Sequence, residues 1–156
     1  MDNNRREFLQ SAGCFGLMVA LYGVSSAEAS SLPVAFIEGT QAGQDRRYPI
    51  PTADGVNIDR SAQMILVRFQ GHLFVFALSC PHQNNALKWV EGDHRFHCTK
   101  HDSVYEEDGR HISGRATRNM DRYAIRRDGD SVVVDIHKWF ESDKDPNGWT
   151  GATVAV

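Results

Sequence analysis

Two cysteines and two histidines in the middle of the chain have the types and spacing of metal ligands. Cys80-x-His82 is followed, after residues 83–97, by Cys98-x-x-His101. The short spacing in each pair lets both side chains point to one side of a tight loop, and two such loops can enclose a small metal centre. Thiolates and imidazoles are ligands that suit zinc and iron. The four residues therefore predict a metal centre.

Two kinds of centre match this ligand set. One is a tetrahedral zinc site with two cysteines and two histidines. The other is a two-iron cluster in which two neutral histidines replace two anionic cysteines, which makes the cluster easier to reduce. Ser103, Tyr105 and Gly114 follow the second ligand pair, and this pattern has no role in a zinc site. The iron–sulfur centre is favoured, and a colourless protein would indicate zinc instead.

Residues 60–136 resemble the Rieske family of [2Fe-2S] proteins. That family typically carries His-Gly-Ser-x-Tyr/Phe from its second ligand histidine, then a Gly, then a Gly-Pro-Ala loop. The corresponding segments here are His-Asp-Ser-Val-Tyr at 101–105, Asp-Gly-Arg at 108–110 and Gly-Arg-Ala at 114–116. The resemblance implies one [2Fe-2S] cluster, with Cys80 and Cys98 on one iron and His82 and His101 on the other.

The resemblance also assigns roles to two hydroxyl groups. Ser103 would donate a hydrogen bond to a bridging sulfide, and Tyr105 would donate one to a cysteine sulfur. Donors to sulfur stabilise the more negative, reduced state and so raise the reduction potential. We expect a potential in the upper half of the family range of roughly −150 to +300 mV, and a midpoint below about 0 mV would contradict this role of the hydroxyls.

The chain departs from the family at four positions. The bc-type branch has an additional cysteine in each ligand loop, and the two form a disulfide. Asn85 and Lys100 stand at those positions, so packing and hydrogen bonds must hold the loops together. Asp102 replaces the family glycine and Arg115 the family proline. We expect a more exposed or more easily distorted site than in quinol-oxidising members.

The first residues of the chain have the pattern of an export signal. Arg5-Arg6 and Phe8-Leu9 resemble a twin-arginine (Tat) signal. The apolar stretch 12–24 is shorter than the roughly 20 residues of a membrane span, and Ala-Glu-Ala at 27–29 fits a cleavage site. We predict a signal peptide at 1–29 and periplasmic localisation, since this route carries folded cargo. An uncleaved membrane anchor is the alternative.

The pattern of the rest of the chain predicts an all-β fold. Strands are expected at 32–37, 64–69, 73–77, 94–97, 123–126 and 131–136, with hairpin signals at Gln70-Gly71 and Asp128-Gly129. Short strands separated by turn signals favour an antiparallel sandwich or small barrel, here with a subdomain of cluster-binding loops. We assign residues 30–140 to the Rieske domain and 141–156 to an irregular tail rich in Asp, Lys, Pro, Asn and Gly.

Size and charge restrict the function further. The formal net charge is −3, which gives no basic field for nucleic acid. A chain of 156 residues has no room for the mononuclear iron domain of an oxygenase catalytic subunit, and no catalytic residue is expected. Five arginines follow the third loop, and they form either a solvated or salt-bridged face or a docking surface for an acidic redox partner: Arg115, Arg118, Arg122, Arg126 and Arg127.

The resemblance and the signal together predict a periplasmic one-electron carrier, or a small redox subunit like those of arsenite-oxidase-like or cytochrome bc-type complexes. Its partner would be a molybdoenzyme, a cytochrome b or a c-type cytochrome, and quinol is a possible substrate. A Rieske ferredoxin serving an oxygenase is the alternative, favoured by the missing disulfide and opposed by the signal. A binding protein with a purely structural metal is the third hypothesis.

Overall fold

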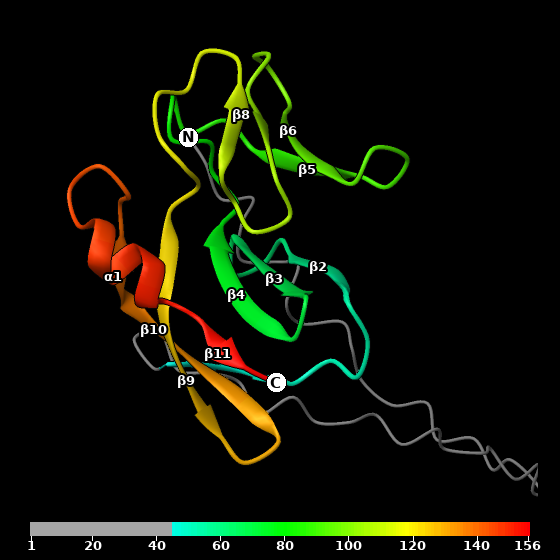
Figure 1. Cartoon of the computed structure of the whole chain (residues 1–156), viewed down its shortest axis with the longest axis vertical. Coiled ribbons are helices and arrows are strands. Elements are labelled where there is room, and N and C mark those ends of the chain that lie inside the picture. Colours follow the sequence, from blue (N-terminus) through cyan, green and yellow to red (C-terminus); the bar gives the residue numbers. More distant parts are fainter. Residues whose placement is uncertain (1–44) are drawn as a thin grey trace, which may run out of the picture. The chain divides into compact units, whose positions relative to one another are not determined.

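The computed structural model describes residues 45–156, which belong to one compact unit. The predicted signal at 1–29 and the strand predicted at 32–37 lie outside the described residues. Within the described part, the chain is mostly β, and its strands pair antiparallel in two sheets (Figure 1). No helix among residues 45–156 has the length and apolar character that crossing a bilayer requires.

The larger sheet contains seven strands in the order β1-β10-β9-β4-β3-β2, with β11 also paired to β4. It curls, because β9 and β4 share only the Phe76–Arg122 pair and β10 is irregular between Asp135 and Trp139. Its strands are β1 (Arg46–Pro49), β2 (Gly55–Asp59), β3 (Met64–Phe69), β4 (His72–Ala77), β9 (Arg122–Asp128), β10 (Ser131–Phe140) and β11 (Val154–Ala155).

The smaller sheet contains four strands in the order β5-β6-β7-β8. They are β5 (Leu87–Val90), β6 (Arg95–Cys98), β7 (Val104–Tyr105) and β8 (His111–Ser113). This sheet is inserted between β4 and β9 in the sequence, so both ligand pairs belong to it or to the loop that enters it. The predicted antiparallel β fold with a cluster-binding loop subdomain is confirmed.

Both predicted hairpins are present. Strands β3 and β4 pair from Phe69 and His72 outward, and the turn residues Gln70 and Gly71 both have positive φ angles, 50° and 73°. Such angles match the right-handed twist of the strands that the turn connects. In the second hairpin, Gly129 takes a φ of 62° between the paired residues Asp128 and Ser131.

Strands β3 and β4 are buried on both faces, which explains why their sequences show little apolar–polar alternation. One face packs against the smaller sheet through Ile65, Val67, Phe74 and Phe76. The other face packs inside the curl of the larger sheet, where Met64, Leu66, Leu73 and Val75 contact Val132 and Val134. The first of these two cores also contains Cys80 and Cys98.

The C-terminal tail differs from the prediction of an irregular segment after residue 140. It forms a short helix, α1 (Pro146–Gly151), and then β11, which extends the larger sheet beside β4 (Figure 1). The Asp145 side chain caps the helix by accepting a hydrogen bond from the Gly148 amide. The polar composition of the segment hides this structure, because tertiary contacts of the buried Trp149 stabilise it.

Candidate metal centre

The first ligand loop closes on itself behind Cys80. The Cys80 amide donates to the Asn85 carbonyl at 2.7 Å, and the Asn84 amide donates to the Cys80 carbonyl at 2.9 Å. Cys98 ends β6, and its amide donates to the Ser103 carbonyl at 2.9 Å. Both thiols are free and buried. The backbone therefore holds two unoxidised cysteines in an apolar core, where thiolates would be costly without a metal.

The two histidines of the motifs lie face to edge. The Nδ1 atoms of His82 and His101 are 3.3 Å apart, and the ring centroids are 4.8 Å apart with an interplanar angle of 84°. Both residues are partly exposed, in contrast to the buried cysteines. The site thus has a sulfur side within the core and a nitrogen side at the surface.

These donors fit a two-iron centre. Metal–nitrogen bonds of about 2.1 Å allow two nitrogens on one ion to lie up to about 4.2 Å apart, and the two Nδ1 atoms lie within that limit. Among residues 45–156, no three His, Cys, Asp or Glu side chains converge as the ligands of a single ion would. Each iron of a [2Fe-2S] cluster takes only two protein ligands, so donors in pairs suit it.

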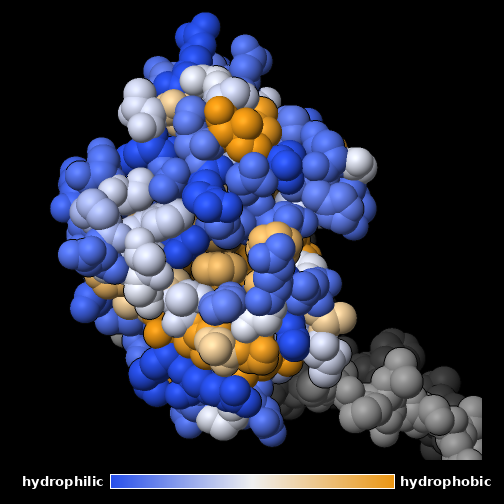
Figure 2. All heavy atoms as spheres, viewed as in Figure 1, coloured by the Kyte–Doolittle hydropathy of each residue, from blue (hydrophilic) through white to orange (hydrophobic). Residues whose placement is uncertain are grey.

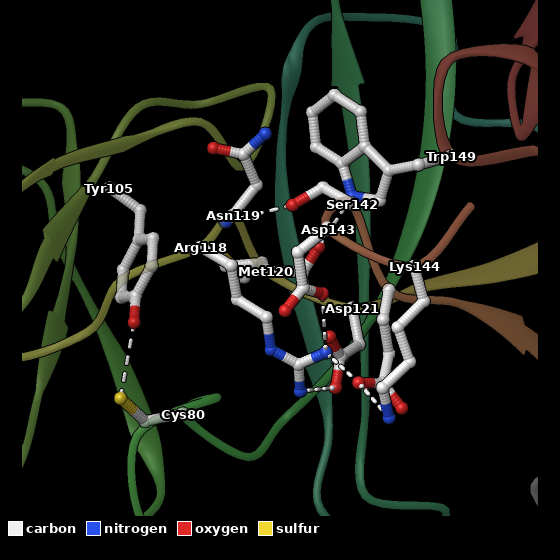
Figure 3. A network of polar contacts seen from close by, with 11 residues as sticks. Cys80, Tyr105, Arg118, Asn119, Met120, Asp121, Ser142, Asp143, Lys144 and Trp149 are labelled. Atoms are coloured by element: carbon white, nitrogen blue, oxygen red, sulfur yellow. Dashed lines mark hydrogen bonds and ion pairs between the residues drawn. The ribbon is translucent and has the colours of Figure 1, made fainter. Parts of the chain in front are cut away.

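The Tyr105 hydroxyl lies 3.1 Å from the Cys80 sulfur, as Figure 3 shows. Tyr105 is fully buried, and desolvation, with a smaller contribution from the hydrogen bond to Cys80, raises its pKa above the ordinary value. The phenol therefore stays protonated and is available as a donor to a thiolate. The His111 ring lies edge-on to the Tyr105 ring at 5.5 Å between centroids.

Ser103 is also fully buried, and it links the second loop to the third. Its Oγ accepts a hydrogen bond from the Ala116 amide at 3.0 Å, which leaves the hydroxyl proton for another acceptor. Gly114 approaches the same segment so closely that an added Cβ would lie 2.2 Å from the Asp102 carbonyl oxygen, and its φ is +95°. Only glycine fits there without displacing backbone.

Charged residues adjoin the histidines. The pKa of His101 is lowered by desolvation first, and then by the charges of His82, Arg115 and Lys100, whereas Asp102 acts in the opposite direction. Lys100, Asp102 and Arg115 are all exposed. The residues that replace the family's glycine and proline thus bring charge next to the nitrogen side of the site.

An ion-pair network, whose acidic partners the sequence did not identify, braces the segment after the third loop. Arg118 lies among three carboxylates, those of Asp121 at 3.1 Å, Asp143 at 3.4 Å and Glu141. Figure 3 shows Asp121 and Asp143 beside its guanidinium. Burial raises the pKa of Asp121 to about 6, and Arg118 opposes this shift. Glu141 and Asp143 are 23 and 25 residues from Arg118 in the chain, and only Asp121, three residues away, is a local partner. A local sequence pattern therefore could not have identified the network.

The five arginines after the third loop do not form one surface. Arg115 is exposed beside the second loop, whereas Arg118 belongs to the network above. Arg122 is buried, with its guanidinium 3.6 Å from the Trp149 ring centroid and hydrogen-bonded to the carbonyls of Trp149 and Asp108. Its pKa is lowered to about 10 by desolvation. Arg126 and Arg127 lie on the exposed hairpin of β9 and β10.

Comparison with known proteins adds three findings. A family model described as "Rieske [2Fe-2S] domain" matches residues 44–124, just over half of the chain. The cytochrome b6-f complex iron-sulfur subunit of Chlorobaculum thiosulfatiphilum is 29% identical over 72 residues, 46% of this chain and 40% of that protein, so the match spans less than half of the relative. The cyanobacterial plasma membrane Rieske protein PetC3 from Synechocystis PCC 6803 has a crystal structure that matches with a TM-score of 0.42 and 20% identity, over 51% of this chain and 82% of that one.

Proposed function

Because this chain belongs to the Rieske [2Fe-2S] domain family, which implies one [2Fe-2S] cluster and electron transfer, we propose that its two buried cysteines and its paired histidines hold that cluster. Cys80 and Cys98 would bind one iron, and His82 and His101 would bind the other. When bound, the cluster takes up and releases one electron at a time. The similarity to a cytochrome b6-f iron-sulfur subunit supports a role like that of bc-type Rieske subunits.

The observation that carries this proposal is the convergence of the histidine nitrogens. The Nδ1 atoms of His82 and His101 face each other at 3.3 Å although the residues belong to different loops. Two neutral imidazoles can also hydrogen-bond at this distance, but two histidines from separate Cys-His motifs with converging nitrogens are the arrangement that a shared iron requires. The Tyr105 hydroxyl at the Cys80 sulfur supports the same assignment on the other side of the site.

The residues of the proposed site have different roles. The cysteines anchor the site in the core shared by both sheets. The Tyr105 hydroxyl lies at the Cys80 sulfur, and Ser103, whose Oγ accepts from the Ala116 amide, would donate its hydroxyl proton to the cluster. The imidazoles of His82 and His101 are partly exposed, whereas Cys80 and Cys98 are buried. An electron would therefore enter and leave through the ring edges of the histidines.

We further propose that the mature domain, residues 30–140 with the tail 141–156, works in the periplasm after export by the twin-arginine route, as a carrier or a small subunit of a respiratory-type complex. The Arg5-Arg6 signal supports this location, and the b6-f relative supports a cytochrome-containing or comparable partner. Replacing both arginines by lysine should retain the protein in the cytoplasm, as fractionation would show.

A Rieske ferredoxin of an oxygenase system is the second candidate, and one observation favours it. Asn85 and Lys100 occupy the positions at which bc-type members carry their additional cysteines, and Cys80 and Cys98 are free. Export would separate such a ferredoxin from cytoplasmic NADH, so the fractionation experiment distinguishes the two candidates.

The ligand assignment is tested by iron and acid-labile sulfide content after expression in a host that assembles iron–sulfur clusters. The parent should contain two irons and two sulfides per chain. His101→Ala should lose both, whereas the control His97→Ala, whose imidazole lies 2.9 Å from Asp93, should retain them. A parent with zinc and no sulfide would overturn the proposal.

A further inference from the structure

Two exposed cations flank the candidate ligand His101, and we name Lys100 and Arg115 the basic rim. Lys100 precedes His101 in the chain. Arg115 comes from the third loop, and its neighbours on both sides are fixed against the second loop. Gly114 lies against the backbone of Asp102, and the Ala116 amide donates to Ser103 at 3.0 Å. The third loop therefore holds Arg115 next to the segment that follows His101.

The charge of the basic rim is not neutralised by ion pairs. Within residues 45–156, neither Lys100 nor Arg115 forms an ion pair, whereas Arg47, Arg68, Arg95, Arg110, Arg118, Arg126 and Lys144 all do. The exposed cations Arg60, Lys88, Arg127 and Lys138 of the same part of the chain also form none. Asp102 is the acidic residue of the same loop and offsets part of the charge. The rim differs from the other unpaired cations in its position beside His101, in a chain whose formal net charge is −3.

The surface beside the histidines is also poor in apolar side chains. Among the described residues, the exposed large hydrophobic side chains are Ile112 on β8 and Trp139 on β10, and neither belongs to a ligand loop. Figure 2 shows hydrophilic side chains at the uppermost end of the molecule, where Figure 1 draws β8 and the adjoining loops, and a hydrophobic patch just below that end. A neutral quinol needs an apolar pocket, whereas a charged protein surface needs opposite charge.

We propose that the basic rim and the exposed edges of the ligand histidines form a docking surface for a redox protein with an acidic patch around its own electron-exchange site. This inference rests on the proposed function, because it assumes that electrons pass through the histidines. Charge complementarity at an electron-exit site steers encounter and raises the association rate, and salt weakens the effect. The five arginines of the sequence analysis thus contribute one member, Arg115, to the surface.

The test uses the reduced full-length protein in a stopped-flow instrument at low ionic strength. Hexacyanoferrate(III), an anion, and tris(phenanthroline)cobalt(III), a cation, each take one electron from the reduced protein and become hexacyanoferrate(II) and the cobalt(II) complex. Poly-L-glutamate is added as a mimic of an acidic protein surface. The variant is Lys100→Glu/Arg115→Glu. The matched control is Arg126→Glu/Arg127→Glu, which makes the same change in net charge on the β9–β10 hairpin.

We expect hexacyanoferrate(III) to oxidise the rim variant about fivefold or more slowly than the parent, and the cobalt complex to oxidise it faster, with both differences shrinking in salt. Poly-L-glutamate should lower the oxidation rate of the parent and of the control. It should leave the oxidation rate of the rim variant unchanged. Equal changes in rim variant and control would show that only total charge matters, and would overturn the proposal.

Two further outcomes separate the proposals from each other. Reduction of the oxidised protein by decylubiquinol, which loses one electron and two protons, at a rate unaffected by poly-L-glutamate and by the rim variant would identify quinol as the occupant and overturn acidic docking. If the proposed function itself fails, dithionite produces no reduced centre and neither oxidant reacts. In that case the failure lies in the cluster and not in the docking surface.

Discussion

Thr99 donates two hydrogen bonds to one oxygen atom, the carbonyl of Ala86. The amide does so at 3.0 Å and the hydroxyl at 2.8 Å. Ala86 ends the first ligand loop and Thr99 begins the second, one residue from the positions Asn85 and Lys100 where bc-type members carry a disulfide. A pair of hydrogen bonds therefore joins the two loops where those relatives have a covalent link.

Thr99→Val keeps the shape of the side chain and the hydrogen bond that the backbone amide donates, and it removes the hydrogen bond that the hydroxyl donates. One such bond contributes about 0.5–1.5 kcal/mol, so we expect the temperature at which the visible absorption is lost to fall by a few degrees. Thr99→Ser retains a hydroxyl and should behave like the parent. If the valine and serine variants lose their visible absorption at the same temperature, the hydrogen bond of the hydroxyl does not help to hold the two loops together.

Tyr105→Phe should lower the reduction potential without loss of the cluster. The hydroxyl lies 3.1 Å from the Cys80 sulfur, and a donor to sulfur favours the reduced state. A differential of about 1 kcal/mol corresponds to about 40 mV for one electron. Redox titration followed by visible absorption measures the shift. An unchanged midpoint would show that the hydroxyl does not affect the potential.

Gly114→Ala should prevent stable cluster binding. A methyl group there meets the Asp102 carbonyl oxygen at 2.2 Å, and the φ of +95° is strained for any residue with a Cβ. A strained backbone conformation alone costs about 1–3 kcal/mol. Gly92→Ala is the control, since nothing lies within 4 Å of a Cβ at that position. Similar iron content in the two purified variants would contradict the close packing of the third loop.

Asp121→Asn tests how burial and the ion pair with Arg118 compete. Because burial raises its pKa to about 6 in the folded protein from the ordinary value of 3.8, the folded state binds the proton more tightly than the unfolded state. This group's contribution to stability is therefore greatest at low pH and falls as pH rises from about 4 to about 6.

The variant lacks this titration, so it should gain stability relative to the parent over the same pH interval, on the order of 1–3 kcal/mol. Urea unfolding followed by tryptophan fluorescence at several pH values measures the difference. If the variant instead loses stability relative to the parent as pH rises, the attraction of Arg118 outweighs the cost of burial.

The parts of the fold that could be predicted from sequence are those with local signals. Gly71 and Gly129 have left-handed φ angles that glycine adopts without strain, so both hairpins could be recognised from the glycines at their turns. The ligand loops could be located because Cys-x-His and Cys-x-x-His are short and chemically distinctive. How Ser103 and Tyr105 are oriented could only be expected from the resemblance.

The C-terminal segment and Arg122 show where sequence reasoning fails. Helix α1 has six residues, too few for a helical period, and Trp149 is held by its indole nitrogen donating to the Met120 carbonyl at 2.7 Å. Arg122 was grouped with surface arginines, but aromatic rings of Phe74 and Trp149 enclose it. Both features depend on residues far apart in the chain, which local patterns do not reveal.

The central claim is that two histidine nitrogens and two cysteine sulfurs of this chain hold a two-iron cluster. Pulsed electron paramagnetic resonance of the dithionite-reduced protein, labelled with ¹⁵N-histidine, tests it most directly. We predict one unpaired spin per chain, coupled to two labelled nitrogens that disappear from the spectrum together with the cluster in the His82→Ala and His101→Ala variants. A reduced protein without a spin signal, or with a signal that shows no coupling to histidine nitrogen, would contradict the account.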